Sequence, residues 1–407
     1  MRILQIHWRY DAFGGGESYL EQLAALLELS GHRVSMMSGV SRSDPARFAP
    51  GREHVVIAES GGIRSGLREL NRVIGYIEDV APDVVHLHHT GGLLSPYIVQ
   101  AINQRYPTIK TVHDVSVICP LGDELIKQCS DELCEYPFDL GCLLRGCYSV
   151  TEKGVHPLLF ALWERRVARQ LDRLLVSTEY MRRELLRNDF PAQRVTVLPL
   201  FTTMNQDGSV GATAAAQKRL LFVGRLDCAK GGHQLIDALA MINLSADWMV
   251  DVIGEGPALH ALKQRVAATA LGERIQFHGR VEAKDVPGFY RRARVVLMPS
   301  MIPESFGLVG VEAMACGRPV VAFDSGGIRD WLVDGDTGFL VERGNVRALA
   351  TRIEQLLTDD SLVEVMGVRA MRRVERLYRP QAHLSQLVAL YEVVGAIGDK
   401  IKRTVRR

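Results

Sequence analysis

The stretch RVVLMPSMIPESFGLVGVEAMACGRPVVAFDS (residues 294–325) holds two short apolar runs with a helical pattern between them. The runs RVVLMPS (294–300) and PVVAFDS (319–325) are nearly continuous in apolar residues, which is typical of strands that helices cover on both faces. The segment between them predicts a helix that starts near Ser305 or Phe306. A strand, a helix and a second strand form the βαβ unit of a parallel sheet.

The same alternation of strands and helices continues through the rest of the chain in two series. In the first series the expected strands span 2–6, 32–38, 83–88, 109–114, 173–178 and 194–199. In the second they span 219–226, 248–254, 274–279, 294–300, 319–325 and 337–341. This pattern predicts an α/β protein with two doubly wound Rossmann-like domains. Ligands of such sheets bind beyond the carboxyl ends of the strands, so we expect a central cleft between the domains.

The chain of 407 residues is longer than the ~250–300 residues at which a single core usually divides. A polar stretch of small residues, TTMNQDGSVGATAAAQK, interrupts the strand pattern and predicts a linker. We expect four parts: an N-terminal domain (1–200) with a cysteine-rich insertion (119–147), a linker (201–218), a C-terminal domain (219–380), and a final helix (381–407) that crosses back to the N-terminal domain.

Composition narrows the class of protein. Hydrophobic residues make up 47% and charged residues 24%, and a net charge of +2 argues against nucleic acid as the main partner. The N-terminus is too short and polar for a signal peptide, and no apolar run reaches the ~20 residues of a membrane helix. We therefore expect a cytoplasmic protein. Its basic C-terminal end is either a solvated helix end or a weak contact with the inner face of the cell membrane.

Three segments have features of phosphate-binding sites. The first, FGGGESYL (13–20), is a glycine-rich turn before a helix, and it fits either a tight structural turn or a close approach to a ligand. The second, FVGRLDCAKGG (222–232), places Arg225 and Lys230 just beyond a strand, where two cations suit a diphosphate. In the third, the first amides of the helix expected after Glu304 can also bind phosphate.

Two glutamates, Glu304 and Glu312, flank the third segment. A carboxylate near a core is costly unless it is paired, and carboxylates beside a phosphate site can accept hydrogen bonds from hydroxyl groups. A diphosphate between two polyols is a nucleotide sugar, so the pair indicates that ligand. The alternative is that Glu304 is a helix-capping charge and Glu312 an exposed helix residue.

With these residues in view, the chain resembles the retaining glycosyltransferases of family four (group 1), which have the GT-B fold. The resemblance extends from Arg2 to about Tyr391. Its most specific element is the spacing of the two glutamates within PESFGLVGVEAMACGRPVVA, supported by GRL…KGG, by VIGEGP (252–257) and by the early GGGE. The chain departs from the family pattern at SGGIRDWL and at LPLFTT.

The resemblance implies that the domain 1–200 is the acceptor-side domain and that the domain 219–380 binds the nucleotide sugar. It also implies roles for individual residues. Arg225 and Lys230 would bind the donor diphosphate, Glu304 the sugar hydroxyls and Glu312 the ribose hydroxyls. His113 would lie near the reacting centre, so the catalytic set would be Glu304, His113, Arg225 and Lys230. The remaining donor-binding positions would be Gly14, Gly15, Gly254, Glu255, Gly256, Pro257 and Arg280, with the helix start at Phe306, Gly307 and Leu308.

Metal sites are a separate question. Cys129, Cys134, Cys142 and Cys147 either form a structural zinc site or are free or partly paired thiols. His86 and His88 share a strand face, as metal ligands could, although a hydrogen-bonded histidine at the strand end is the simpler interpretation. For catalysis we expect no metal and no further cofactor, because the two cations can neutralise the leaving group.

These features predict a retaining hexosyltransferase active in polysaccharide or natural-product biosynthesis. Its donor would be a nucleotide-diphosphate sugar of the UDP or GDP type. Its acceptor would be a hydroxyl group of a glycan, a lipid-linked glycan or a small natural product. The alternatives are another GT-B activity, such as a phosphorylase or an epimerase, and a catalytically silent nucleotide-sugar-binding protein.

Overall fold

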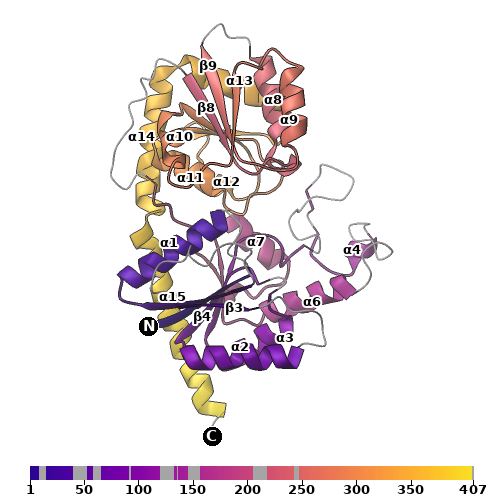
Figure 1. Cartoon of the computed structure of the whole chain (residues 1–407), viewed down its shortest axis with the longest axis vertical. Coiled ribbons are helices and arrows are strands. Elements are labelled where there is room, and N and C mark those ends of the chain that lie inside the picture. The colour runs from indigo at the N-terminus through magenta and orange to yellow at the C-terminus, as the bar shows by residue number, and fades with distance from the viewer. Residues whose placement is uncertain are drawn as a thin grey trace. The chain divides into compact units, whose positions relative to one another are not determined.

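The computed structural model describes residues 1–8, 15–39, 53–57, 66–90, 93–119, 133–134, 136–144, 156–204, 218–242 and 247–405. The chain divides into two compact units (Figure 1). Unit 1 comprises Met1–Pro199 together with Gln381–Arg407, and unit 2 comprises Leu200–Pro380.

Unit 1 is built on a parallel sheet in the order β3-β2-β1-β4-β5-β6-β7. The described strands are β1 (Arg2–His7), β2 (Arg33–Gly39), β3 (Glu53–Ile57), β4 (Val84–Leu87), β5 (Thr108–Val112), β6 (Arg173–Val176) and β7 (Val195–Val197). All pairings are parallel. The strand order reverses between β1 and β4, which places a topological switch point at their carboxyl ends.

The helices of unit 1 follow from capping and apolar spacing. Ser95 and Thr178 each accept a hydrogen bond from a backbone amide three residues further on, and Pro96 follows Ser95 at the first helical position. The helices are α1 (Gly15–Leu29), α2 (Gly66–Val80), α3 (Pro96–Arg105), α4 (Gly141–Leu144), α6 (His156–Ala168), α7 (Glu179–Arg187), a 3₁₀ turn at Ala192–Arg194, and α15 (Pro380–Val405). The long helix α15 belongs to unit 1 from Gln381 onward.

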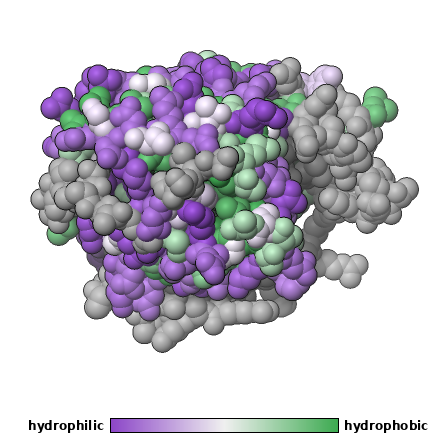
Figure 2. Space-filling model, turned by 90° about the horizontal axis from the view of Figure 1, so that it is seen from above, coloured by the Kyte–Doolittle hydropathy of each residue, from purple (hydrophilic) through white to green (hydrophobic). Residues whose placement is uncertain are grey.

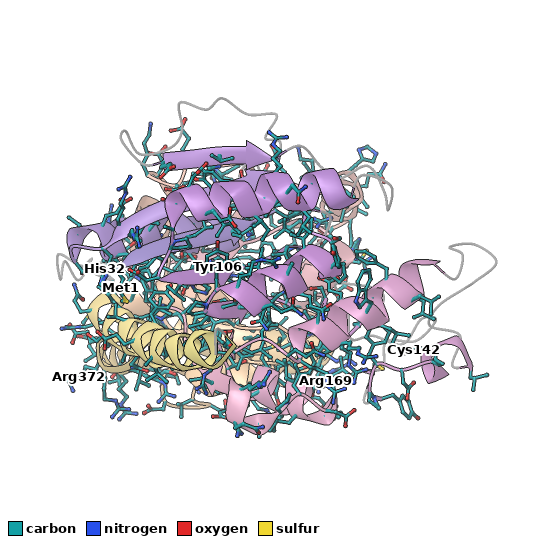
Figure 3. All side chains as sticks on the ribbon, turned by 90° about the horizontal axis from the view of Figure 1, so that it is seen from below. Met1, His32, Tyr106, Cys142, Arg169 and Arg372 are labelled. Atoms are coloured by element: carbon teal, nitrogen blue, oxygen red, sulfur yellow. The ribbon has the colours of Figure 1, made fainter. Side chains whose placement is uncertain are left out.

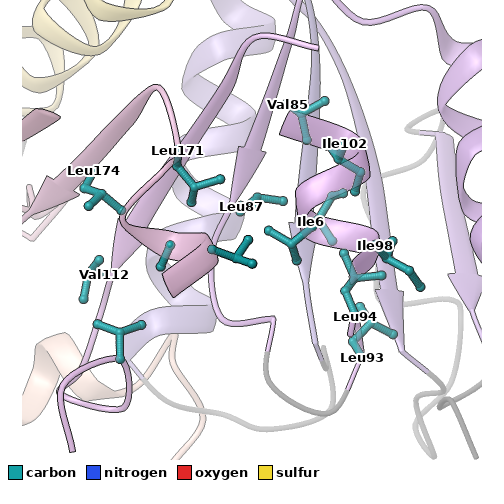
Figure 4. Close-up of a cluster of buried hydrophobic side chains, with 14 of the residues drawn as sticks. Ile6, Val85, Leu87, Leu93, Leu94, Ile98, Ile102, Val112, Leu171 and Leu174 are labelled. Carbon is teal, nitrogen blue, oxygen red and sulfur yellow. The ribbon is translucent and has the colours of Figure 1, made fainter. Parts of the chain in front are cut away.

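The two faces of the unit 1 sheet differ in polarity. One face forms an apolar core with α2 and α3, in which Ile6, Val85, Leu87, Ile98 and Ile102 are buried side by side (Figure 4). The other face carries a series of buried polar side chains, namely Gln5, His7, Ser38, His86, His88 and Thr111. Because side chains alternate along a strand, the leucines and valines between these residues face the apolar core.

Unit 2 has a second parallel sheet, in the order β10-β9-β8-β11-β12-β13. Its strands are β8 (Lys218–Val223), β9 (Trp248–Ile253), β10 (Ile275–Gly279), β11 (Val295–Met298), β12 (Val320–Phe323) and β13 (Gly338–Val341). Its helices are α8 (Gly232–Met241), α9 (Leu259–Ala267), α10 (Val286–Arg292), α11 (Leu308–Ala315), α12 (Ile328–Trp331), α13 (Val346–Thr358) and α14 (Asp360–Leu377), with a 3₁₀ turn at Cys228–Lys230. The prediction of two Rossmann-like domains is confirmed.

All twelve strands expected from the sequence are present, with ends displaced by a few residues. The sheet of unit 1 also contains β3, which we did not predict. The predicted linker falls mostly on 205–217, which lie outside the described residues. In the described part of the chain, no helix is both long and apolar enough to cross a membrane, and the face shown in Figure 2 is mainly hydrophilic.

Candidate functional site

The switch point of the unit 2 sheet lies between β8 and β11. These strands are neighbours, whereas the strands that flank them continue in opposite directions across the sheet. Ligands of such sheets bind beyond the carboxyl ends of the strands at the switch point. Here the segments that follow β8 and β11 contact each other, since the amide of Met301 donates to the carbonyl oxygen of Ala229 at 2.8 Å. Lys230 follows β8 and Glu304 follows β11.

The side chains of Lys230 and Glu304 meet at this edge. The Nζ atom of Lys230 lies 2.6 Å from Oε1 of Glu304, and the hydroxyl group of Ser300 donates to the same oxygen at 2.5 Å. The side chain of Glu304 is 11% exposed and that of Lys230 is 30% exposed. The pair is thus partly desolvated, but a ligand can still reach it.

The backbone around Lys230 is fixed by a cap and a tight contact. Asp227 accepts a hydrogen bond from the amide of Lys230 at 3.1 Å and pairs with Nε of Arg225 at 3.2 Å. Gly231 has a φ of 72°, and a Cβ atom there would come within 1.7 Å of the carbonyl oxygen of Pro299. Only glycine can therefore hold this turn against the segment after β11. Arg225 is 70% exposed.

The helix after Glu304 starts later than we predicted. α11 begins at Leu308, not near Ser305 or Phe306, because Gly307 has a left-handed φ of 81° that breaks the helical path. The amides of Leu308 and Val309, at the helix N-terminus, have no acceptor within the helix, whereas the amide of Gly310 donates to the carbonyl oxygen of Gly307 at 3.0 Å. Phe306 is buried, and its carbonyl oxygen accepts a hydrogen bond from the indole of Trp331. Among the predicted amide donors, Gly307 and Leu308 immediately border the helix N-terminus.

Glu312 lies on α11 and is not an exposed surface residue. Tyr290 of α10 donates a hydrogen bond to its Oε2 at 2.8 Å. Burial raises the pKa of Glu312 to about 7, although the hydrogen bond from Tyr290 lowers it in part. A carboxylate in this state is ready to accept further hydroxyl donors, since each one favours its ionised form.

The carboxyl ends of strands β9 and β10 lie at the same edge of the unit 2 sheet. Gly254 has a φ of 132°, and a Cβ atom there would lie 1.9 Å from the carbonyl oxygen of Gly224. A Cβ atom at Gly256 would lie 2.2 Å from the carbonyl oxygen of Leu226. The segment that includes Glu255 and Pro257 therefore packs tightly against the turn that carries Arg225. The predicted residues Glu255, Pro257 and Arg280 are exposed.

The remaining predicted residues belong to unit 1. His113 follows β5 and lies 3.0 Å from His88, measured from Nε2 to Nδ1. Gly15 is the exposed first residue of α1, whereas Gly14 lies outside the described residues. His86 contacts Tyr391 at 2.6 Å and Thr111 at 2.7 Å. His86 and His88 thus both have hydrogen-bond partners, which agrees with the interpretation that they are hydrogen-bonded histidines and not metal ligands.

The cysteine cluster is only partly described. Cys142 lies on the short helix α4 (Figure 3) and is buried, and Cys134 is partly exposed. Cys129 and Cys147 fall outside the described residues. Within the described ranges, no three His, Cys, Asp or Glu side chains are grouped so as to hold a metal ion. The structural zinc site stays a prediction.

Two side chains at the site were not identified from the sequence. Ser300 follows β11 in the quoted stretch, and its place just beyond an apolar strand is a signal that could have been used. Tyr290 lies 22 positions before Glu312, and no spacing or motif links them. Only the packing of α10 against α11 brings its hydroxyl group to the carboxylate.

Comparisons with known proteins agree with this architecture. The family model described as a glycosyl transferase 4-like domain matches residues 14–200, and the model of the group 1 glycosyl transferases matches residues 209–373. A phosphatidyl-myo-inositol mannosyltransferase of Mycobacterium leprae is 37% identical over 190 residues, which are 46% of this chain and 49% of that protein. An alpha-D-kanosaminyltransferase of Streptomyces kanamyceticus is 29% identical over 248 residues, 58% of this chain and 64% of the relative. The chain thus spans about half the length of the curated relatives it matches.

Solved structures share the fold over nearly the whole chain. A sucrose-phosphate synthase from Thermosynechococcus elongatus has a TM-score of 0.75 at 22% identity and covers 97% of this chain and 99% of its own. HepE of Anabaena, solved in complex with UDP and glucose, has a TM-score of 0.71 at 19% identity and covers 97% of this chain and 100% of its own. The two halves of the chain thus match these two glycosyl transferase models, and the solved structures show that the chain has the GT-B fold.

Proposed function

We propose that this protein is a retaining glycosyltransferase that moves a hexosyl unit from a nucleotide-diphosphate sugar to a hydroxyl group of an acceptor. The acceptor class is a glycan, a lipid-linked glycan or a small natural product. The observation that carries the proposal is the contact between Lys230 and Glu304 at the switch point of unit 2. It joins a cation suited to a diphosphate with a carboxylate suited to sugar hydroxyls.

The proposed mechanism rests on charge at the leaving group. As the bond between the anomeric carbon and the diphosphate breaks, negative charge grows on the diphosphate. Lys230, Arg225 and the amides at the start of α11 would stabilise that charge. Glu304 would accept hydroxyl donors from the sugar. The diphosphate itself would take the proton from an acceptor that attacks on the same face, so no side-chain nucleophile is needed.

The donor is proposed to be a UDP or GDP sugar. HepE of Anabaena has been solved with UDP and with UDP-glucose, which favours uridine. In this chain, Glu312 would accept the ribose hydroxyls. The exposed Glu255, Pro257 and Arg280 would border the base. We place the reaction in the cytoplasm, with peripheral contact to the inner face of the cell membrane through the basic C-terminal end.

The experiment that tests the function is a donor screen followed by transfer. A ligand that binds the folded state raises the melting temperature, so UDP-, GDP-, ADP- and dTDP-sugars are compared by thermal shift. The stabilising sugar is then offered with candidate acceptors. Nucleotide diphosphate should appear at a substantial rate only when acceptor is present, and the product should keep the anomeric configuration of the donor. Release that is independent of every acceptor would contradict the proposal.

Binding of the nucleotide should depend on pH through Glu312. Ribose hydroxyls favour the ionised carboxylate, so the pKa of Glu312, about 7 in the free protein, should fall on binding and a proton should be released. At one unit below that pKa only about a tenth of the carboxylate is ionised, so the affinity at pH 6 should be several-fold lower than at pH 8. Calorimetry with bare nucleotide diphosphate in buffers of different ionisation enthalpy measures both effects.

Two matched substitutions separate the glutamates. Glu312→Gln should weaken binding of the bare nucleotide diphosphate by about 1–3 kcal/mol and remove the part of the pH dependence that Glu312 causes, leaving that of the terminal phosphate. Glu304→Gln should leave that affinity unchanged or raise it, because Lys230 loses a partner that competes with the diphosphate. It should lower kcat, because the activation barrier rises by about 2–4 kcal/mol. Equal behaviour of the two variants would show that the assigned roles are wrong.

Transfer should not require a divalent cation, because Lys230 and Arg225 are proposed to neutralise the diphosphate. We expect kcat to change by less than about twofold after EDTA treatment. Thermal unfolding measured in parallel separates loss of a structural metal from loss of a catalytic one. Complete inactivation that Mg²⁺ or Mn²⁺ reverses would show that a cation holds the diphosphate.

A further inference from the structure

The histidine pair His88 and His113 lies at the carboxyl ends of β4 and β5, beside the switch point between β1 and β4. His88 is the residue after β4, His113 is the residue after β5, and the two strands are neighbours. Nδ1 of His88 lies 3.0 Å from Nε2 of His113, and the rings stack at 23° with centroids 5.3 Å apart. The side chain of His88 is fully buried, whereas His113 is partly exposed.

A hydrogen bond between two neutral imidazoles needs one protonated and one unprotonated nitrogen, so one ring must donate and the other accept. If His113 donated from Nε2, His88 would carry its proton on its own Nε2. Among the residues that the structure describes, that buried nitrogen contacts no hydrogen-bonding partner. A buried N–H group without an acceptor is rarer and less favourable than a buried acceptor without a donor. The favoured arrangement therefore has His88 donating from Nδ1.

This hydrogen bond determines which ring nitrogen of His113 carries the proton. Its Nε2 accepts from His88, so the single proton of the neutral ring is on Nδ1. The exposed part of His113 then offers an N–H donor. In this tautomer Nδ1 already carries a proton and cannot accept another, and the ring becomes an imidazolium only if Nε2 is protonated and loses the hydrogen bond from His88. Burial together with the neighbouring His7 opposes that charge by lowering the pKa of His113 to about 4.

His88 is itself held by the elements around it. Its ring lies 4.1 Å from the ring of His86, measured between centroids. His86 in turn has both ring nitrogens occupied, by the hydroxyl groups of Tyr391 on α15 and Thr111 on β5. His86 cannot rotate without losing these two contacts, so its ring restricts the position of the neighbouring His88 ring.

We propose that His88 is a positioning residue that holds His113 in its Nδ1–H tautomer, so that His113 donates a hydrogen bond to an oxygen atom of the bound sugar. His113 is thereby a donor in the transfer reaction and not a general base. The inference deepens the proposed function and rests on it for the identity of the ligand. The tautomer itself follows from unit 1 alone.

The first test is nuclear magnetic resonance of the protein labelled with ¹⁵N-histidine. Two-bond correlations from the ring protons distinguish protonated from unprotonated nitrogens, and the signals of His113 are those that disappear in His113→Gln. We expect Nδ1 of His113 to be protonated at pH 7.5 in the wild-type protein. A proton on Nε2 of His113 would overturn the proposal. This result is independent of whether any sugar is transferred.

The second test compares two substitutions of similar size. The amide nitrogen of Asn takes the place of Nδ1 in His88→Asn and can still donate, whereas His88→Leu cannot. We expect kcat to fall about tenfold in His88→Leu and by less than about threefold in His88→Asn. Equal losses would overturn the positioning role. If the wild-type protein transferred no sugar, the proposed function would fail while the tautomer measurement would still decide this inference.

Discussion

Lys230→Ala is expected to lower kcat for sugar transfer by about 10²–10³-fold, the effect of removing one donor aimed at developing charge. The substitution removes the cation that would face the diphosphate. It also leaves the carboxylate of Glu304 with Ser300 but without its ion-pair partner. The loss should appear in kcat as well as in kcat/KM, because the contact strengthens as the leaving group gains charge.

The controls for this prediction lie in the same unit. Lys284 pairs with Glu282 at 2.7 Å, and both side chains are more than 70% exposed. Lys284→Ala should therefore keep wild-type activity, since exposed pairs contribute little.

Arg225→Ala, like Lys230→Ala, should lose most of the activity while the protein stays folded, because Arg225 is 70% exposed and no cavity results. Wild-type kcat in Lys230→Ala would refute the assignment of the cation.

The sequence predicted the strands well because parallel strands buried on both faces are runs of apolar residues. β3 was missed because it begins with Glu53 and His54, which leave only the three apolar residues Val55–Ile57 in the strand. The start of α11 was misplaced because the break depends on the φ angle of Gly307. A glycine permits that angle, but its presence in a sequence does not require it.

The sequence predicted which residues form the candidate site and which strands they follow, but not the contacts between their side chains. Lys230 and Glu304 are 74 positions apart, and only the neighbouring positions of β8 and β11 in the sheet bring them into contact. The raised pKa of Glu312 depends on burial and on Tyr290, which no spacing indicates. The partners of the histidines depend likewise on α15, whose side chains reach the unit 1 sheet from the far end of the sequence.

The polar face of unit 1 should make the protein sensitive to acid. Burial lowers the pKa of His86 to about 3, that of His113 to about 4 and that of His383 to about 4, from an ordinary value of 6.5. In the unfolded chain these rings regain the ordinary value and bind protons more tightly than in the folded state. The stability they contribute is therefore fully present above pH 6.5 and is lost as the pH falls from 6.5 toward 4.

The size of this effect is large compared with the stability of a domain. One pKa unit corresponds to about 1.4 kcal/mol, so each of these histidines contributes about 3 kcal/mol or more across that range. Even one such contribution is a large part of the ~5–15 kcal/mol that stabilise a typical domain. We therefore expect unit 1 to lose much of its stability as the pH falls from 6.5 toward 4. One place where this acts is the contact of α1 with α15, where Tyr19 lies 2.8 Å from His383.

Urea unfolding at a series of pH values measures this prediction. The free energy of unfolding should fall by more than about 1.4 kcal/mol per pH unit below pH 6, the slope that corresponds to the uptake of one proton. His383→Gln should reduce that slope by up to one proton, because Gln does not titrate. His260 is an exposed histidine on α9, so His260→Gln should leave the slope unchanged. A free energy of unfolding that stays constant from pH 7 to pH 5 would show that protons do not destabilise the buried histidine cluster.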